Sequence, residues 1–167
     1  MLRCAALTLA LLIAVPSATA GLKRGDRAAE FVQVVDEKGQ RVSLKRFRDQ
    51  VVVITFGASW CEPCKKELPA LEKLAVKYYS KHAKIVFLAV NIDNEADKGK
   101  KFMARAGLKC VRALFDRQKT AVESYDPPKM PTTFVIRRGI VKHVHAGFAA
   151  GDEARLAAII DRELAAR

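Results

Sequence analysis

Apolar residues gather in short runs along the chain, and these runs predict strands. Residues 51–56 and 85–92 are nearly continuous in β-forming apolar side chains, which is typical of strands covered on both faces. Shorter runs predict three further strands, at residues 111–115, 132–136 and 140–144. Only Arg137-Arg138-Gly139 separates the last two strands, so we expect them to form a hairpin.

Helices are predicted where apolar residues recur at every third or fourth position. The first such series is Leu68, Leu71, Leu74, Ala75 and Tyr78. It predicts a helix that runs to about Tyr79. Further helices are predicted at residues 96–106, stopped by Gly107, and at 118–125. Asp152 is expected to cap a last helix that ends near Ala165.

The order of these elements indicates the fold class. Residues 31–35 and 41–44 alternate apolar with polar side chains around a turn at 36–39, which predicts an N-terminal hairpin. Strands and helices then alternate, and a hairpin and a helix close the chain. This order predicts an α/β fold with a mixed central sheet and helices on both faces.

The first twenty residues differ from the rest and predict a signal peptide. Arg3 supplies a positive start, residues 4–15 form an apolar stretch short for a bilayer, and Ala18-Thr19-Ala20 fits a cleavage site. We therefore expect a mature chain that begins at Gly21 and resides in the periplasm, where disulfides persist. An uncleaved membrane anchor is the rival interpretation. Residues 21–167 have the length of one domain with its own core.

The charge of the chain is strongly positive. The formal net charge is +12, and it falls by one to +11 when the signal peptide with Arg3 is removed. Acidic residues lie between the basic ones, and no basic stripe interleaved with aromatic residues is visible, which argues against nucleic-acid binding. We interpret the charge as a source of solubility and of weak attraction to acidic partners or an anionic membrane surface.

The chemistry is indicated by Trp60-Cys61-Glu62-Pro63-Cys64, which follows the strand predicted at 51–56. Two thiols separated by two residues can close and reopen a disulfide. Pro63 fits the first turn of a helix, where a backbone N–H would have no partner. The unpaired N–H groups and the dipole at such a helix start favour a thiolate. We expect Cys61, the more exposed thiol, to attack a substrate disulfide and Cys64 to resolve the mixed disulfide.

A metal site is the alternative for the same cysteines. Structural zinc normally takes four ligands, and a second cysteine pair at the required spacing is absent from the sequence. His143 and His145 share one face of a predicted strand and would have to complete a copper or zinc site. A protein built on such a site would be a non-enzymatic module that handles metal or binds clients. The redox interpretation requires no cofactor beyond the cysteine pair.

Three segments resemble the exported TlpA/ResA-like thiol–disulfide oxidoreductases of the thioredoxin-fold superfamily. They are residues 56–69 around the cysteines, residues 86–93, and Met130-Pro131-Thr132-Thr133-Phe134-Val135-Ile136. The resemblance implies a thioredoxin-like fold over residues 21–167 and reduction of disulfides in exported proteins. It also implies a membrane thiol electron donor and makes cytochrome c maturation a candidate process. A dithiol oxidase of the same fold stays open, because direction depends on the reduction potential.

The resemblance also implies roles for residues around the cysteines. In the family the proline before Thr-x-Phe is cis, which carries over to Pro131 and would turn Met130 toward the dithiol to pair with substrate main chain. Trp60 would form an apolar platform beside the thiols for a partner chain. Glu62, which the family motif shares, should disfavour the thiolate and oppose the neighbouring Lys65 and Lys66.

Two features depart from the expected pattern. Thr55 stands where thioredoxins carry a buried aspartate, so the proton shuttle for Cys64 must come from elsewhere, and we predict Asp93 or Glu95 after the strand at 85–92. Cys110 is a third thiol within residues 21–167. We expect it to be a buried small apolar residue, with a reactive site for intermolecular pairing as the alternative.

Overall fold

Strand β2 (Val51–Gly57) lies at the centre of a six-stranded mixed sheet whose order is β1-β4-β3-β2-β5-β6. The computed structural model describes residues 21–81 and 83–166, so the predicted signal peptide lies outside the described residues. The other strands are β1 (Val35–Asp36), β3 (Ile85–Asn91), β4 (Arg112–Phe115), β5 (Thr132–Arg137) and β6 (Ile140–Ala146). β2 pairs parallel with β3 and antiparallel with β5, which confirms the predicted mixed sheet.

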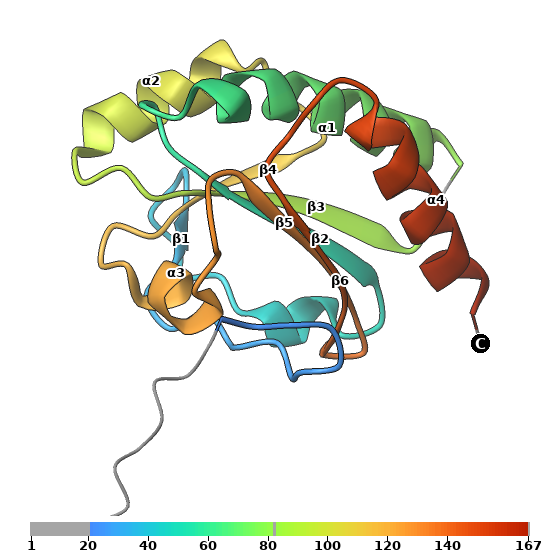
Figure 1. Ribbon diagram of the computed structural model, residues 1–167. Coiled ribbons are helices and arrows are strands. Elements are labelled where there is room, and N and C mark those ends of the chain that lie inside the picture. The colour runs from blue at the N-terminus through green and yellow to red at the C-terminus, as the bar shows by residue number, and fades with distance from the viewer. Residues whose placement is uncertain (1–20, 82, 167) are drawn as a thin grey trace, which may run out of the picture.

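Helices cover both faces of this sheet, as predicted. Figure 1 shows α1 (Glu62–Ser80), α2 (Ala96–Arg105) and α4 (Asp152–Ala165) across one face. The short helix α3 (Thr120–Tyr125) and a 3-10 helix, η1 (Leu44–Phe47), lie on the other face. None of the helices in the described part of the chain is long and apolar enough to cross a membrane.

The alternation of side chains along β2 divides the core into two clusters. Val51 and Val53 pack in the cluster beneath α1, α2 and α4, together with Cys61 and Cys64. Val52 and Ile54 point the other way, into the cluster that contains Tyr125 of α3. Because both faces are covered, every residue of β2 is buried, as its nearly continuous apolar run predicted.

The N-terminal hairpin is much smaller than predicted. Val35 and Arg41 form one isolated bridge, and Asp36 accepts the amide of Gly39 across the turn. β1 pairs with β4 instead, and the predicted second strand gives way to η1, which Ser43 caps by accepting the amide of Lys45. The side chain of Ser43 therefore stabilises a helical turn where simple alternation predicts a strand.

The start of the last helix also differs from the prediction by one residue. Gly151, at φ 93°, is the N-cap of α4, and Asp152 lies in the first turn without capping it. The Asp152 carboxylate instead accepts the amide of Ala149 at 2.7 Å and pairs with His145 at 3.0 Å. This carboxylate therefore ties α4 to the end of β6.

Candidate active site at the start of helix α1

Cys61 and Cys64 form a disulfide at the first turn of α1. Cys61 is the N-cap residue, and its Sγ accepts the amide of Cys64 at 3.2 Å. Pro63 lies in the first turn of the helix, as the sequence predicted. The pair therefore lies at the positive end of a helix dipole, which favours a thiolate once the disulfide is reduced.

The two cysteines are shielded while the tryptophan beside them is not. Cys61 is 4% exposed and Cys64 1% exposed, whereas Trp60 is 64% exposed. Both sulfurs thus lie at the edge of the core, with a large apolar side chain open to solvent next to Cys61. An exposed tryptophan is suited to contact with a partner chain.

The loop that leads into the motif is held by Asp93. Its carboxylate accepts the amide of Ser59 at 2.9 Å and the hydroxyl of Ser59 at 2.8 Å. The side-chain amide of Asn91 donates to the same carboxylate at 2.7 Å. Glu95, the other predicted proton shuttle, is exposed and pairs with Lys98 at 2.6 Å. The structure therefore gives Asp93 a positioning role and places Glu95 on the surface.

A second buried acid of this site is Glu67, which sequence reasoning missed. Its carboxylate accepts the hydroxyls of Thr55 and Thr133, each at 2.6 Å. Burial raises the pKa of Glu67 to about 7, although the two threonine hydrogen bonds lower it. At the position where thioredoxins carry an aspartate, Thr55 therefore donates a hydrogen bond to Glu67, an acid that α1 supplies.

His145 and Asp152 line the same small cavity as Glu67, between α1, β5 and the start of α4. His145 pairs with Asp152, and the ring of His143 stacks against that of His145 with centroids 6.4 Å apart. Among residues 21–81 and 83–166, no three His, Cys, Asp or Glu side chains gather where they could hold a metal ion. The two histidines therefore share one face as predicted, but His145 is engaged with a carboxylate.

The Met130–Pro131 segment has the conformation that the resemblance implied. The Met130–Pro131 bond is cis, as the resemblance implied. Met130 packs against the cluster that contains both cysteines. Glu62 is exposed and forms an ion pair with Lys65 one turn further along α1.

Comparison with known proteins assigns the family. The profile of the Redoxin family matches residues 23–160. The chain belongs to the Redoxin family. Within it, the thiol-disulfide oxidoreductase ResA of Geobacillus kaustophilus is 34% identical over 124 residues, which are 74% of this chain and 69% of that protein. ResA of Bacillus anthracis is 33% identical over 112 residues, 67% of this chain and 62% of that protein.

Solved structures agree with this assignment. A crystal structure of a Chlorobium tepidum protein proposed to be the thiol:disulfide interchange protein DsbE has a TM-score of 0.77 at 32% identity, covering 86% of this chain and 99% of that one. A Bacteroides thetaiotaomicron protein proposed to be a protein disulfide isomerase has a TM-score of 0.76 at 24% identity, covering 88% and 94%. The second likeness concerns the fold alone.

This Redoxin-family chain is a ResA-like thiol–disulfide oxidoreductase with a thioredoxin-like fold. Its redox group is the Cys61–Cys64 pair itself, since conversion between the dithiol and the disulfide transfers the two electrons of each turnover. The resemblance to TlpA/ResA-like oxidoreductases, which rested on three sequence segments, is therefore confirmed.

Cys110 lies apart from the active site and is half-buried. Its amide donates to both carboxylate oxygens of Glu72, at 2.9 and 3.1 Å. Burial raises the pKa of the Cys110 thiol, and the charge of Glu72 raises it further. Cys110 is thus less buried than expected from the sequence, and its raised pKa disfavours the thiolate, which is the reactive form.

Proposed function

We propose that this oxidoreductase works as a reductase of disulfides in exported proteins. The observation that supports this direction is the burial of both sulfurs in the apolar cluster beneath α1, with the buried acid Glu67 one helical turn after Cys64. Apolar surroundings and a nearby carboxyl group disfavour thiolates and so oppose the stabilisation that the helix dipole gives them. A dithiol whose thiolates are poorly stabilised returns readily to the disulfide and so gives up its electrons.

The proposed reaction proceeds in two exchanges. The Cys61 thiolate attacks a substrate disulfide, forms a mixed disulfide and releases one substrate sulfur as a thiolate, which takes up a proton. Cys64 then loses its proton and attacks Cys61 Sγ, which releases the second substrate sulfur and closes the Cys61–Cys64 disulfide. The substrate gains two electrons from the cysteine pair and two protons, which balance the proton that Cys61 released on forming its thiolate and the proton that Cys64 loses.

Glu67 is the proposed acceptor of the Cys64 proton. It follows Cys64 by three residues on α1, and side chains at this spacing lie on one face of a helix. A carboxyl group whose pKa is about 7 exchanges protons readily near neutral pH. Asp93 and Glu95, our expectation from the sequence, already bind Ser59 and Lys98.

The compartment and partners form the second part of this proposal. The predicted signal peptide at residues 1–20 supports export to the periplasm, where client disulfides form. A reductase in that compartment must be re-reduced from elsewhere, so we propose a membrane thiol donor that opens the Cys61–Cys64 disulfide after each turnover. Likeness to ResA and DsbE keeps cytochrome c maturation as the candidate process.

The reduction potential of the pair, measured against glutathione, tests the direction. We expect a value nearer to that of thioredoxin, about −270 mV, than to that of the oxidant DsbA, about −120 mV. A potential near the DsbA value would make the protein an oxidase. The roles of the cysteines are tested with Cys64→Ser, which should accumulate mixed disulfides through Cys61 on non-reducing gels. Equal trapping by Cys61→Ser would reverse the two roles.

A further inference from the structure

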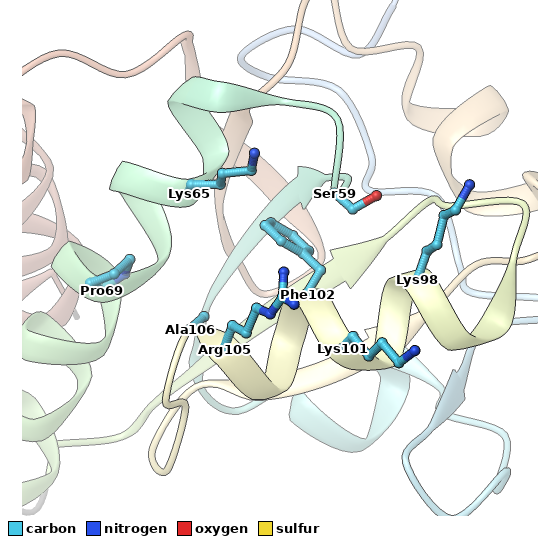
Figure 2. Close-up of a pocket in the computed structure, with 8 residues that line it drawn as sticks. All are labelled: Ser59, Lys65, Pro69, Lys98, Lys101, Phe102, Arg105 and Ala106. Atoms are coloured by element: carbon cyan, nitrogen blue, oxygen red, sulfur yellow. The ribbon is translucent and has the colours of Figure 1, made fainter.

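A cleft of about 470 Å³ lies between α1 and α2, directly beside the loop that leads into the cysteine motif. Figure 2 shows its walls: Lys65 and Pro69 come from α1, Ser59 from the loop, and Phe102 rises from α2 between them. Phe102 is buried and forms an apolar floor. The cleft therefore offers apolar surface beside Ser59, which precedes the exposed Trp60 in the sequence.

The rim of this cleft is cationic. Lys65 and Lys98 are each bound to a glutamate, Glu62 and Glu95. Lys101 and Arg105 are exposed on α2, and within the part of the chain that the structure describes they form no ion pair. Two positive charges thus remain uncompensated beside an apolar floor.

The cleft is held in a defined position relative to Cys61. Gly99 of α2 packs so closely on β3 that a Cβ there would lie 2.2 Å from Oδ1 of Asn91. Asn91 binds Asp93, and Asp93 holds Ser59, two residues before Cys61. An occupant of the cleft would therefore be placed in register with the attacking sulfur.

We propose that this cleft binds an acidic segment of the client polypeptide that carries an apolar side chain close to the target disulfide. The apolar side chain would pack on Phe102, and a carboxylate would meet Lys101 and Arg105. The proposal rests on the proposed function, since it concerns which protein disulfides the pair acts on. It adds a charge preference that the dithiol chemistry alone does not require.

The test uses two peptides with the same disulfide and the same leucine, one followed by three glutamates and the other by three lysines. In the wild-type protein we expect kcat/KM for the acidic peptide to exceed that for the basic one roughly tenfold at low ionic strength, and to approach it as salt is added. Each rate is divided by the rate on hydroxyethyl disulfide, which is too small to span the cleft. A wild-type ratio near one overturns the proposal without any variant.

The double variant Lys101→Glu/Arg105→Glu should remove the preference or reverse it. The matched control is Arg48→Glu/Lys84→Glu, which changes the net charge equally at exposed positions near the opposite end of β2. The control should retain the wild-type ratio. Equal loss in both variants would assign the preference to the net charge of the whole chain and overturn the cleft as its source.

Two further outcomes are separable. If the cleft variant loses binding to phosphatidylglycerol vesicles but keeps the peptide ratio, the cleft serves a membrane surface and the proposal is wrong. If the protein reduces no disulfide but oxidises the dithiol forms of the peptides, the reductase direction fails instead. The acidic-to-basic ratio is then measured in the oxidising direction, where it tests the cleft in the same way.

Discussion

Glu67 occupies a helix position where the spacing of α1 calls for an apolar residue, three after Cys64 and four before Leu71. It is buried, and it interrupts the apolar series from Cys64 to Tyr78. A glutamate on such a stripe is the one signal in the sequence that could have identified it. The absence of an aspartate at Thr55 pointed instead to Asp93 and Glu95, which follow β3.

The raised pKa of Glu67 has a consequence for stability. The unfolded chain releases this proton near 4.5, whereas the folded protein keeps it until about pH 7. Between these values the native state binds more protons, so the free energy of unfolding should fall as pH rises, by up to about 3 kcal/mol. Glu67→Gln removes this fall and keeps hydrogen-bonding groups for both threonines. Urea unfolding from pH 4.5 to pH 8 measures it.

Other ionisable groups titrate in both proteins and cancel in the comparison. The stability of Glu67→Gln relative to the wild type should therefore improve steadily from pH 4.5 toward pH 7. A difference that does not change with pH would show that Glu67 ionises at its ordinary pKa. The same variant should slow the second exchange of the reaction, seen as longer-lived mixed disulfides.

Cys110 supports a second prediction. Because burial and Glu72 raise the pKa of this thiol, its alkylation at pH 7 should be slower in the folded protein than in urea. The Cys61→Ser/Cys64→Ser variant isolates Cys110 for this measurement by mass spectrometry. Cys110→Ala should retain disulfide-reductase turnover. Labelling as fast in the folded as in the unfolded protein, or loss of turnover, would reveal a second redox site.

At the scale of elements, the end of β2 and the start of α1 meet at Gly57. A Cβ on this residue would lie 3.1 Å from Sγ and 3.2 Å from Cβ of Cys64. Gly57→Ala should therefore force the strand and the helix apart and destabilise the protein by about 1–3 kcal/mol. Denaturant unfolding of both redox forms measures the loss.

The source of that loss is tested by adding Cys64→Ala, which removes the sulfur that the new methyl group meets. In a double-mutant cycle on the reduced protein, the two substitutions should couple, so that Gly57→Ala costs less when Cys64→Ala is also present than when Cys64 is retained. Additive costs would place the strain elsewhere than at the sulfur of Cys64.

The central elements were predictable because their signals are strong and local. β2 and β3 are nearly continuous apolar runs, and α2 ends one residue before its predicted end, ahead of Gly107 at φ 67°. The N-terminal hairpin was not predictable in detail. Glu30 accepts the amide of Leu44, fourteen residues away, and this contact fixes the start of η1. The apolar–polar pattern of residues 41–44 carries no information about a partner as distant as Glu30.

The site was predictable to a similar extent. The motif around Cys61 is local, and the resemblance supplied Pro131. The cleft floored by Phe102 was not predicted, because α1 and α2 meet there only through the tertiary fold. The pairing of Asp152 with His145 likewise arises where the end of β6 returns toward α4, which changes a predicted cap into a link between elements.

For the whole molecule, the proposed direction of electron flow predicts which redox form is the more stable. A pair that reduces its clients must lie lower in energy as a disulfide, and the folded protein bears that difference. We expect the oxidised protein to unfold at a higher temperature than the reduced one. The reverse order, which holds for DsbA-type oxidants whose reduced form is stabilised, would contradict the reductase proposal independently of any potential measurement.

The segment from Leu22 to Ala28 is tied to parts of the chain that are made much later. Leu22 donates its amide to Tyr125, Gly25 to Val141 and Ala28 to Gly139. At about 5–20 residues per second, a ribosome supplies these partners several seconds after the segment itself. The sheet waits equally, since β5 enters beside β2 from the last third of the chain. Under vectorial export, the leading residues would therefore cross first and stay unfastened until almost the whole polypeptide had followed them.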